Sequence, residues 1–126
     1  MNRRSFLSYG IATMTGFFFF SKPAFATQSS VRIEVPDTVS SGQEITIKLH
    51  VSHDGNNFLH HTDWVYVKIN DQEIKRWEFG VFDTPESNNF TREIKYMVMT
   101  PIVITSEANC NLHGSTGISE KKVMVP

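Results

Sequence analysis

Residues 44–51, which read EITIKLHV, alternate strictly between polar and apolar side chains. A period of two places successive side chains on opposite faces of an extended chain, so this stretch predicts a β-strand with one buried face. Residues 64–69, WVYVKI, repeat the alternation, and neither run fits the 3.6-residue period of a helix. We expect five further strands near residues 31–35, 73–79, 90–98, 102–108 and 121–125.

Residues that favour turns separate these expected strands. Asn70-Asp71 stands between two strand candidates and predicts a tight hairpin. About seven short strands in about 100 residues predict an all-β fold, an immunoglobulin-like antiparallel β-sandwich. The cysteine and tryptophan spacing of true immunoglobulin domains is absent, so the prediction covers the architecture only. The other turn candidates are Pro36-Asp37, Ser40-Ser41-Gly42, Asp83-Thr84-Pro85 and Thr100-Pro101.

Residues 1–26 read as an export signal that precedes a single domain at 27–126. Arg3 and Arg4 come before an apolar stretch at 6–20, and Ala24-Phe25-Ala26 is a small-x-small cleavage site. The start NRRSFL resembles the twin-arginine signal, which implies export of a folded protein, to the periplasm or otherwise out of the cytoplasm. Fifteen residues are short for a bilayer span, so we expect no stable membrane span after cleavage. An uncleaved anchor is the alternative.

Charge and cysteine content narrow the class of protein. Without the three basic side chains of residues 1–26, the other hundred residues hold nine basic and thirteen acidic side chains, a net charge of −4. Nucleic acid is therefore not an expected partner, because phosphate binding needs a basic surface. The single cysteine excludes an intramolecular disulfide.

The histidines and the cysteine gather in two short segments. Four of the five histidines lie within twelve residues, and the fifth follows the cysteine by three. Imidazole is the commonest metal ligand among side chains, and a thiolate beside it raises the affinity for iron, copper or zinc. A Gly-Asn-Asn loop can fold back between two of the histidines, so a metal could bridge both segments. The candidates are His50, His53, His60 and His61 in one segment and Cys110 and His113 in the other.

Each candidate also has a plain structural interpretation. His50 falls on the polar face of its strand, where an ordinary surface histidine is the commoner case. His61 adjoins His60 and is either exposed or a supporting hydrogen-bond donor. Cys110 on its own is consistent with a small buried apolar side chain. It is the combination of Cys110 with three histidines that favours a metal site.

Two motifs resemble those of a known family. Cys110-Asn111-Leu112-His113-Gly114 is similar to the C-N-x-H-G motif of the desulfoferrodoxin and superoxide reductase family. His60, followed four residues later by Trp64 and then an aliphatic residue, resembles the family's second motif. His53 resembles the histidine that precedes that motif.

The resemblance implies a mononuclear iron (Fe2+/Fe3+), held by four histidines in a plane and one axial thiolate. It implies one-electron reduction of superoxide to hydrogen peroxide, with electrons from an external donor protein or small reductant. Cys110 and His113 would then be catalytic. The implied metal ligands are His53, His60, His61, Cys110 and His113.

This sequence departs from the family pattern at several points. The loop between His53 and His60 is one residue longer than expected, and Asp54 stands where a proline is usual. Residues 27–49 contain no histidine, so the fourth equatorial position falls to His61, His50, water or nothing. The lysine that attracts superoxide in the family has no counterpart here.

Two other functions compete with superoxide reduction, so the sequence leaves enzyme activity undecided. One is a non-catalytic metal-binding or carrier module on the same scaffold. The other is a structural sandwich that binds a protein along a sheet edge and carries a covalent modification at Cys110.

Overall fold

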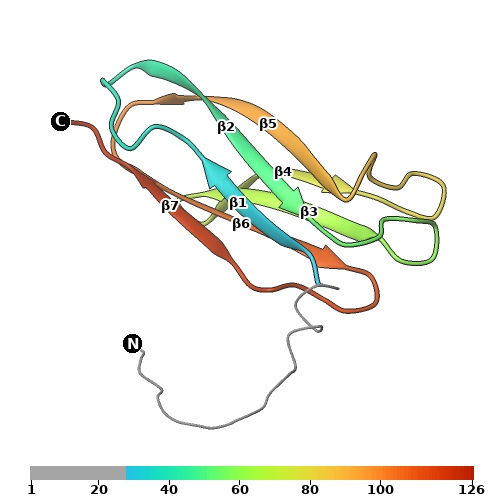
Figure 1. The fold of residues 1–126 in the computed structure, drawn as a ribbon. Helices are drawn as coiled ribbons and strands as arrows, with labels where there is room; N and C mark the ends of the chain where they lie inside the picture. The colour runs from blue at the N-terminus through green and yellow to red at the C-terminus, as the bar shows by residue number, and fades with distance from the viewer. Residues whose placement is uncertain (1–27) are drawn as a thin grey trace, which may run out of the picture.

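The computed structural model describes residues 28–126, so the expected export signal lies outside the described residues. Within them the chain forms seven strands, at or near the positions that the alternation predicts (Figure 1). The strands are β1 (Ser30–Glu34), β2 (Gln43–Ser52), β3 (Thr62–Ile69), β4 (Gln72–Glu78), β5 (Asn89–Val98), β6 (Ile102–Cys110) and β7 (Ser119–Val123).

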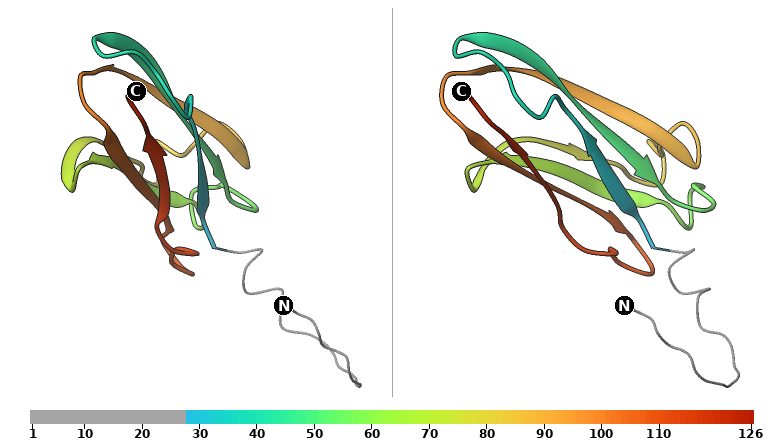
Figure 2. Two further views of the ribbon diagram at one scale, coloured as in Figure 1. Left: turned by 90° about the vertical axis from the view of Figure 1, so that its left-hand side faces the viewer. Right: turned by 60° about the vertical axis from the view of Figure 1, so that its left-hand side comes forward.

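Two antiparallel sheets face each other as two layers (Figure 2). One has the order β1-β2-β5 and the other the order β4-β3-β6-β7. The prediction of an all-β antiparallel sandwich is confirmed. Residues 28–126 include no helix that is long and apolar enough to cross a bilayer.

The core lies between the sheets and is built from the apolar half of each alternating run. In β2 the buried side chains are those at every second position, including Ile47 and Leu49, which are completely inaccessible. Val65 and Val67 of β3 belong to the same buried cluster, together with Ile104 of β6. Burying one such aliphatic side chain stabilises the fold by about 1.5–3 kcal/mol.

The hairpin predicted at Asn70-Asp71 joins β3 to β4. Both residues have positive φ, 52° and 68°. Two left-handed residues in a two-residue loop form the turn whose twist matches that of the flanking strands, and Asn and Asp tolerate this conformation. The hairpin prediction is therefore confirmed.

Strand directions bring three loops together at one end of the sandwich. Ser52 is paired with Asn89, and Thr62 with Cys110, so the loops at 53–61, 79–88 and 111–118 share this end, which we call the loop end (Figure 1). The β3–β6 register shifts between Thr62 and Trp64. Such a bulge locally bends a strand and redirects its side chains, and bulges are common beside functional sites.

Candidate metal centre

His53 and His60 meet across the 53–61 loop. Their Nε2 atoms lie 3.2 Å apart, and the two rings are edge-on with centroids separated by 4.6 Å. His53 is only 3% exposed, while His60 is partly buried. The loop thus folds back as the Gly-Asn-Asn sequence suggested, and two imidazole nitrogens face each other.

Cys110 and His113 share a tight turn at the end of β6. The Cys110 N–H donates to the Gly114 carbonyl (2.8 Å), and the Gly114 N–H donates back to the Cys110 carbonyl (3.0 Å). Gly114 closes this turn with a φ of +84°, a conformation that L side chains rarely adopt. The His113 N–H donates to the Cys110 sulfur (3.4 Å), which holds the two residues on the same turn.

The two segments converge on one point. The ligand atoms of His53, His60 and Cys110 all lie within 4.8 Å of one another. His113 adjoins this group, since its Nδ1 is 3.0 Å from the His60 Nε2 and 3.8 Å from the Cys110 Sγ. Cys110 is buried and His113 is exposed, so the cluster extends from the protein interior to the surface.

The donor set and its spacing fit a transition metal ion. Two nitrogens that bind one ion at about 2.1 Å and at right angles lie about 3.0 Å apart. The His60 Nε2 has that spacing to His113 and nearly that spacing to His53. Imidazoles with a thiolate suit iron, copper or zinc better than calcium or magnesium, which prefer oxygen ligands.

Asn56 fixes which nitrogen of His53 faces the cluster. The buried Thr62 N–H donates to the Asn56 Oδ1 (2.8 Å), so this atom is an acceptor. The His53 Nδ1 lies 2.8 Å from the same oxygen and must therefore carry the proton. The lone pair of the neutral ring is then on Nε2, the atom that faces His60. A histidine with this tautomer is ready to bind a metal.

His61 is also buried, and it forms hydrogen bonds to the Asn57 carbonyl and to the Asn111 side chain. Its Nδ1 donates to the Asn57 carbonyl (3.0 Å), and its N–H donates to the Asn111 Oδ1 (3.0 Å). The Asn111 amide nitrogen in turn donates to the Leu59 carbonyl (3.1 Å), which joins the two ligand loops. His61 is not among the three residues whose ligand atoms converge, and its role as a ligand stays a prediction.

His50 lies elsewhere, on the outer face of the three-stranded sheet. Its Nε2 is 2.7 Å from a Glu34 carboxylate oxygen, and its Nδ1 is 3.1 Å from the Thr91 hydroxyl. The hydrogen bond from His50 holds the pKa of Glu34 below its ordinary value. This is the surface role that the strand pattern favours for His50, and the structure does not bring it to the cluster.

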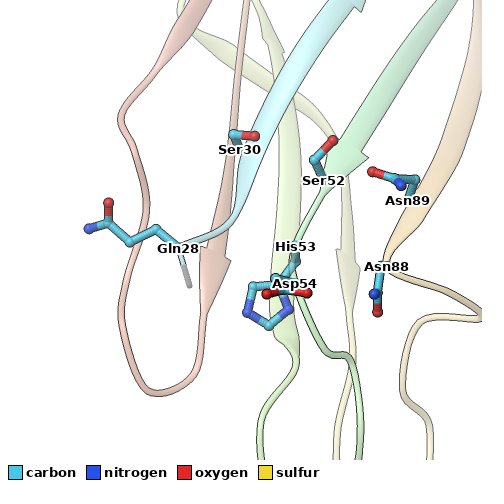
Figure 3. Close-up of a pocket in the computed structure, with 7 residues that line it drawn as sticks. All are labelled: Gln28, Ser30, Ser52, His53, Asp54, Asn88 and Asn89. Carbon is cyan, nitrogen blue, oxygen red and sulfur yellow. The ribbon is translucent and has the colours of Figure 1, made fainter. Parts of the chain in front are cut away.

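A polar pocket of about 300 Å³ opens beside His53 (Figure 3). Asp54 supplies the one carboxylate of the lining, and the lining contains no lysine or arginine. Of the residues in the cluster, only His53 lines this pocket. The other lining residues are Gln28, Ser30, Ser52, Asn88 and Asn89.

The start of the described chain runs past the cysteine turn. The Gln28 amide nitrogen donates to the His113 carbonyl (3.2 Å), and the Ser29 N–H donates to the Gly114 carbonyl (3.2 Å). The Ser29 hydroxyl is buried and lies 2.8 Å from that of Thr62. These contacts hold the first sheet against the turn that carries Cys110.

Sequence reasoning missed the asparagines that frame the cluster. Asn56, Asn57 and Asn111 each accept one or more hydrogen bonds from loop N–H groups or histidines, and Asn88 accepts from Gly55 and Asn56. The signal was visible, since asparagines stand directly beside or near the candidate ligands in both segments. Asparagine suits this role because its amide offers both donors and acceptors to a backbone outside regular structure.

Comparison with known proteins identifies relatives of this chain. The family model described as Desulfoferrodoxin matches residues 24–116, most of the chain. No curated protein matches the sequence.

Solved structures share the fold at low sequence identity. A superoxide reductase (neelaredoxin) from Ignicoccus hospitalis is 19% identical with a TM-score of 0.64, over 82% of this chain and 85% of that one. The reduced superoxide reductase from Archaeoglobus fulgidus is 17% identical with a TM-score of 0.56, over 76% and 89%. A CARDB domain from Pyrococcus furiosus, solved with di-metal ions, is 16% identical with a TM-score of 0.59, over 78% and 87%. The fold is thus shared by proteins with different names, so it does not by itself identify a function.

Proposed function

Because the chain belongs to the desulfoferrodoxin family, we propose that it is a mononuclear iron protein that reduces superoxide to hydrogen peroxide. One observation carries the proposal: the ligand atoms of His53, His60 and Cys110 converge within 4.8 Å, and His113 adjoins them. The same convergence supports the residue roles that the family motifs imply.

We assign a role to each residue of the cluster. His53, His60 and His113 hold the iron through nitrogen, and Cys110 holds it through sulfur. His61 supports the site through its bond to the Asn57 carbonyl before His60 and through its N–H, which donates to the Asn111 side chain of the other segment. Asn56 keeps the His53 proton on Nδ1, so that Nε2 is available as a ligand.

The chemistry divides between iron and protein. Ferrous iron, when bound, supplies the single electron that, with two protons, converts superoxide to hydrogen peroxide, and an external donor returns that electron. The Cys110 thiolate contributes electron density, which favours release of the reduced product. Solvent supplies the protons, since His113 is exposed and the pocket beside His53 admits water.

A second function has its own supporting observation. The three loops of the loop end contain three carboxylates, of which that of Glu86 is paired with Arg92 in β5, and they contain no lysine or arginine. Such a surface favours the approach of a cation over that of the superoxide anion. It therefore supports a metal-binding or carrier module as the alternative, in which Cys110 and the histidines store or deliver the metal.

Spectroscopy of the iron-loaded protein tests the first proposal. We expect the oxidised protein to show a thiolate-to-iron charge-transfer band and Cys110→Ser to abolish it. His50→Ala is the matched control, because His50 lies away from the cluster, and it should keep the band. A wild-type spectrum without the band at full iron loading would overturn the assignment.

Stopped-flow mixing with superoxide then separates the two functions. The first proposal expects the ferrous protein to be oxidised rapidly as superoxide disappears, and expects His61→Ala to retain bound iron. A charge-transfer band without superoxide consumption would favour the carrier. Metal analysis of protein isolated from its own cellular compartment adds the identity of the bound metal.

Export of the protein is part of the same proposal. The basic start and apolar stretch of residues 1–26 support a twin-arginine route to the periplasm or the cell exterior. Changing Arg3 and Arg4 together to lysine should trap the protein in the cytoplasm, which cell fractionation would detect.

A further inference from the structure

Large apolar side chains project from the tips of all three loops at the loop end. Phe82 is fully exposed, and the others are at least half exposed. Large apolar side chains that gather on an exposed surface often mark a binding site. We call these residues the apolar tips: Phe58 and Leu59, Val81 and Phe82, and Leu112.

The tip at Val81 and Phe82 is held in place by its own turn. The Gly80 N–H donates to the Asp83 carbonyl (3.2 Å), and the Asp83 N–H donates to the Gly80 carbonyl (3.1 Å). This reciprocal pair confines Val81 and Phe82 to a two-residue turn. Their exposure is thus a feature of a fixed backbone.

Hydrogen bonds join the three loops into one unit. The Asn56 amide nitrogen donates to the Ser87 carbonyl (2.7 Å), which ties the first loop to the second. Asn111 bonds Leu59 and His61, which ties the first loop to the third. The apolar tips therefore belong to one connected group of loops, at the end where the metal cluster reaches the surface.

From these observations we infer that the loop end rests on the surface of an electrically neutral lipid bilayer. The tips are separate projections, a shape that suits insertion between lipid headgroups. Because the loops lack lysine and arginine, nothing in them attracts anionic lipid.

The position of the chain start supports the same partner. Gln28 lies at the loop end, bonded to His113, and the apolar stretch at 6–20 precedes it. Seven residues lie between Phe20 and Gln28, and the eight Cα-to-Cα steps of an extended chain span at most about 26–29 Å. In the uncleaved chain, any bilayer that receives the apolar stretch therefore lies within that distance of Gln28, which is at the loop end.

Tryptophan quenching by brominated lipid tests the orientation in the full chain. Phe82→Trp and Leu112→Trp place a reporter on two different tips, and Met97→Trp places one on an exposed site at the opposite end. Each protein is mixed with vesicles of brominated phosphatidylcholine, and its emission is compared with that of the unsubstituted chain, which carries two native tryptophans.

We expect the added emission of both tip reporters to be lost and that of Met97→Trp to be kept. This comparison reports which end of the sandwich meets the bilayer. Unquenched tip reporters would overturn the inference, and so would equal quenching at all three positions. If the tip reporters become shielded from solvent at high protein concentration and in the absence of lipid, the tips contact a second copy of the chain instead.

Discussion

Replacing Asn56 with alanine tests whether the metal cluster depends on its hydrogen-bond frame. Asn56 accepts from the His53 Nδ1 and the Thr62 N–H and donates to the Ser87 carbonyl, at 2.8, 2.8 and 2.7 Å. Alanine removes all three hydrogen bonds. It also frees the His53 ring to change its tautomer and orientation.

The structure sets the expected size of the effect on stability. Thr62 is completely buried, so its N–H loses its acceptor without gaining water, at a cost of about 1–3 kcal/mol. The bond to Ser87 lies on an exposed loop and contributes about 0.5–1 kcal/mol more. We expect the free energy of unfolding of metal-free Asn56→Ala to fall by about 1.5–4 kcal/mol.

The effect on metal binding is a separate quantity. Loss of a partner that orients a metal-binding histidine lowers metal affinity by about 10–100-fold. Chelator competition with ferrous iron under anaerobic conditions measures this, and thermal unfolding of the metal-free protein measures stability. Asn56→Asp keeps an acceptor for His53 and Thr62 and should retain most of the iron affinity.

Asn89→Ala is the matched control, because Asn89 is an exposed asparagine in the pocket beside His53. Its stability should change by less than about 0.5 kcal/mol. Iron affinity of Asn56→Ala equal to that of the unsubstituted protein would refute the argument. Equal losses in Asn56→Ala and Asn56→Asp would also refute it, since only the alanine removes the acceptor.

Three further results follow from other features. Gly114→Ala should lower the free energy of unfolding by about 1 kcal/mol or more, because alanine is strained at the positive φ of residue 114. The thermal unfolding midpoint should fall, and an unchanged midpoint would contradict this reasoning. Hydrogen bonding to Arg92 lowers the pKa of Glu86 below its ordinary value of 4.5. The pair therefore stabilises the fold fully above pH 4.5, and this stabilisation is lost as the pH falls through the lowered pKa. Unfolding midpoints measured against pH should therefore decline less steeply in Glu86→Gln. The rate of superoxide consumption should increase as the salt concentration rises from low ionic strength, because salt screens the repulsion between the superoxide anion and the acidic loops. A rate that decreases with salt would show that the loop end attracts the anion instead.

The fold could be predicted well from the sequence because one face of most strands is buried. Alternation at Ile45, Ile47 and Leu49 leaves a single register that buries the apolar set, and turn residues mark where each strand stops. β4 shows where the signal weakens: almost all of its side chains are exposed, and its position followed from the hairpin at Asn70-Asp71.

The site could be predicted only in part. Histidine and cysteine are common metal ligands, so His53, His60, Cys110 and His113 could be selected as candidates from the sequence alone. The hydrogen-bond frame did not, because any asparagine in a loop is equally compatible with a solvent-exposed turn. Which histidine nitrogen carries a proton depends on a partner such as Asn56, and only the three-dimensional contacts reveal that partner.

The bond from Gln28 to the His113 carbonyl has a practical consequence for anyone who prepares this protein. A polyhistidine tag fused just ahead of residue 28 would lie beside the residues that we propose as iron ligands and would compete with them for metal. Pro126 lies at the opposite end of the sandwich (Figure 1), beyond Met124, which is bonded to Val39 and Asp37. Purification handles, immobilisation chemistry and fluorescent fusions therefore belong at the carboxyl terminus, where they leave the centre untouched.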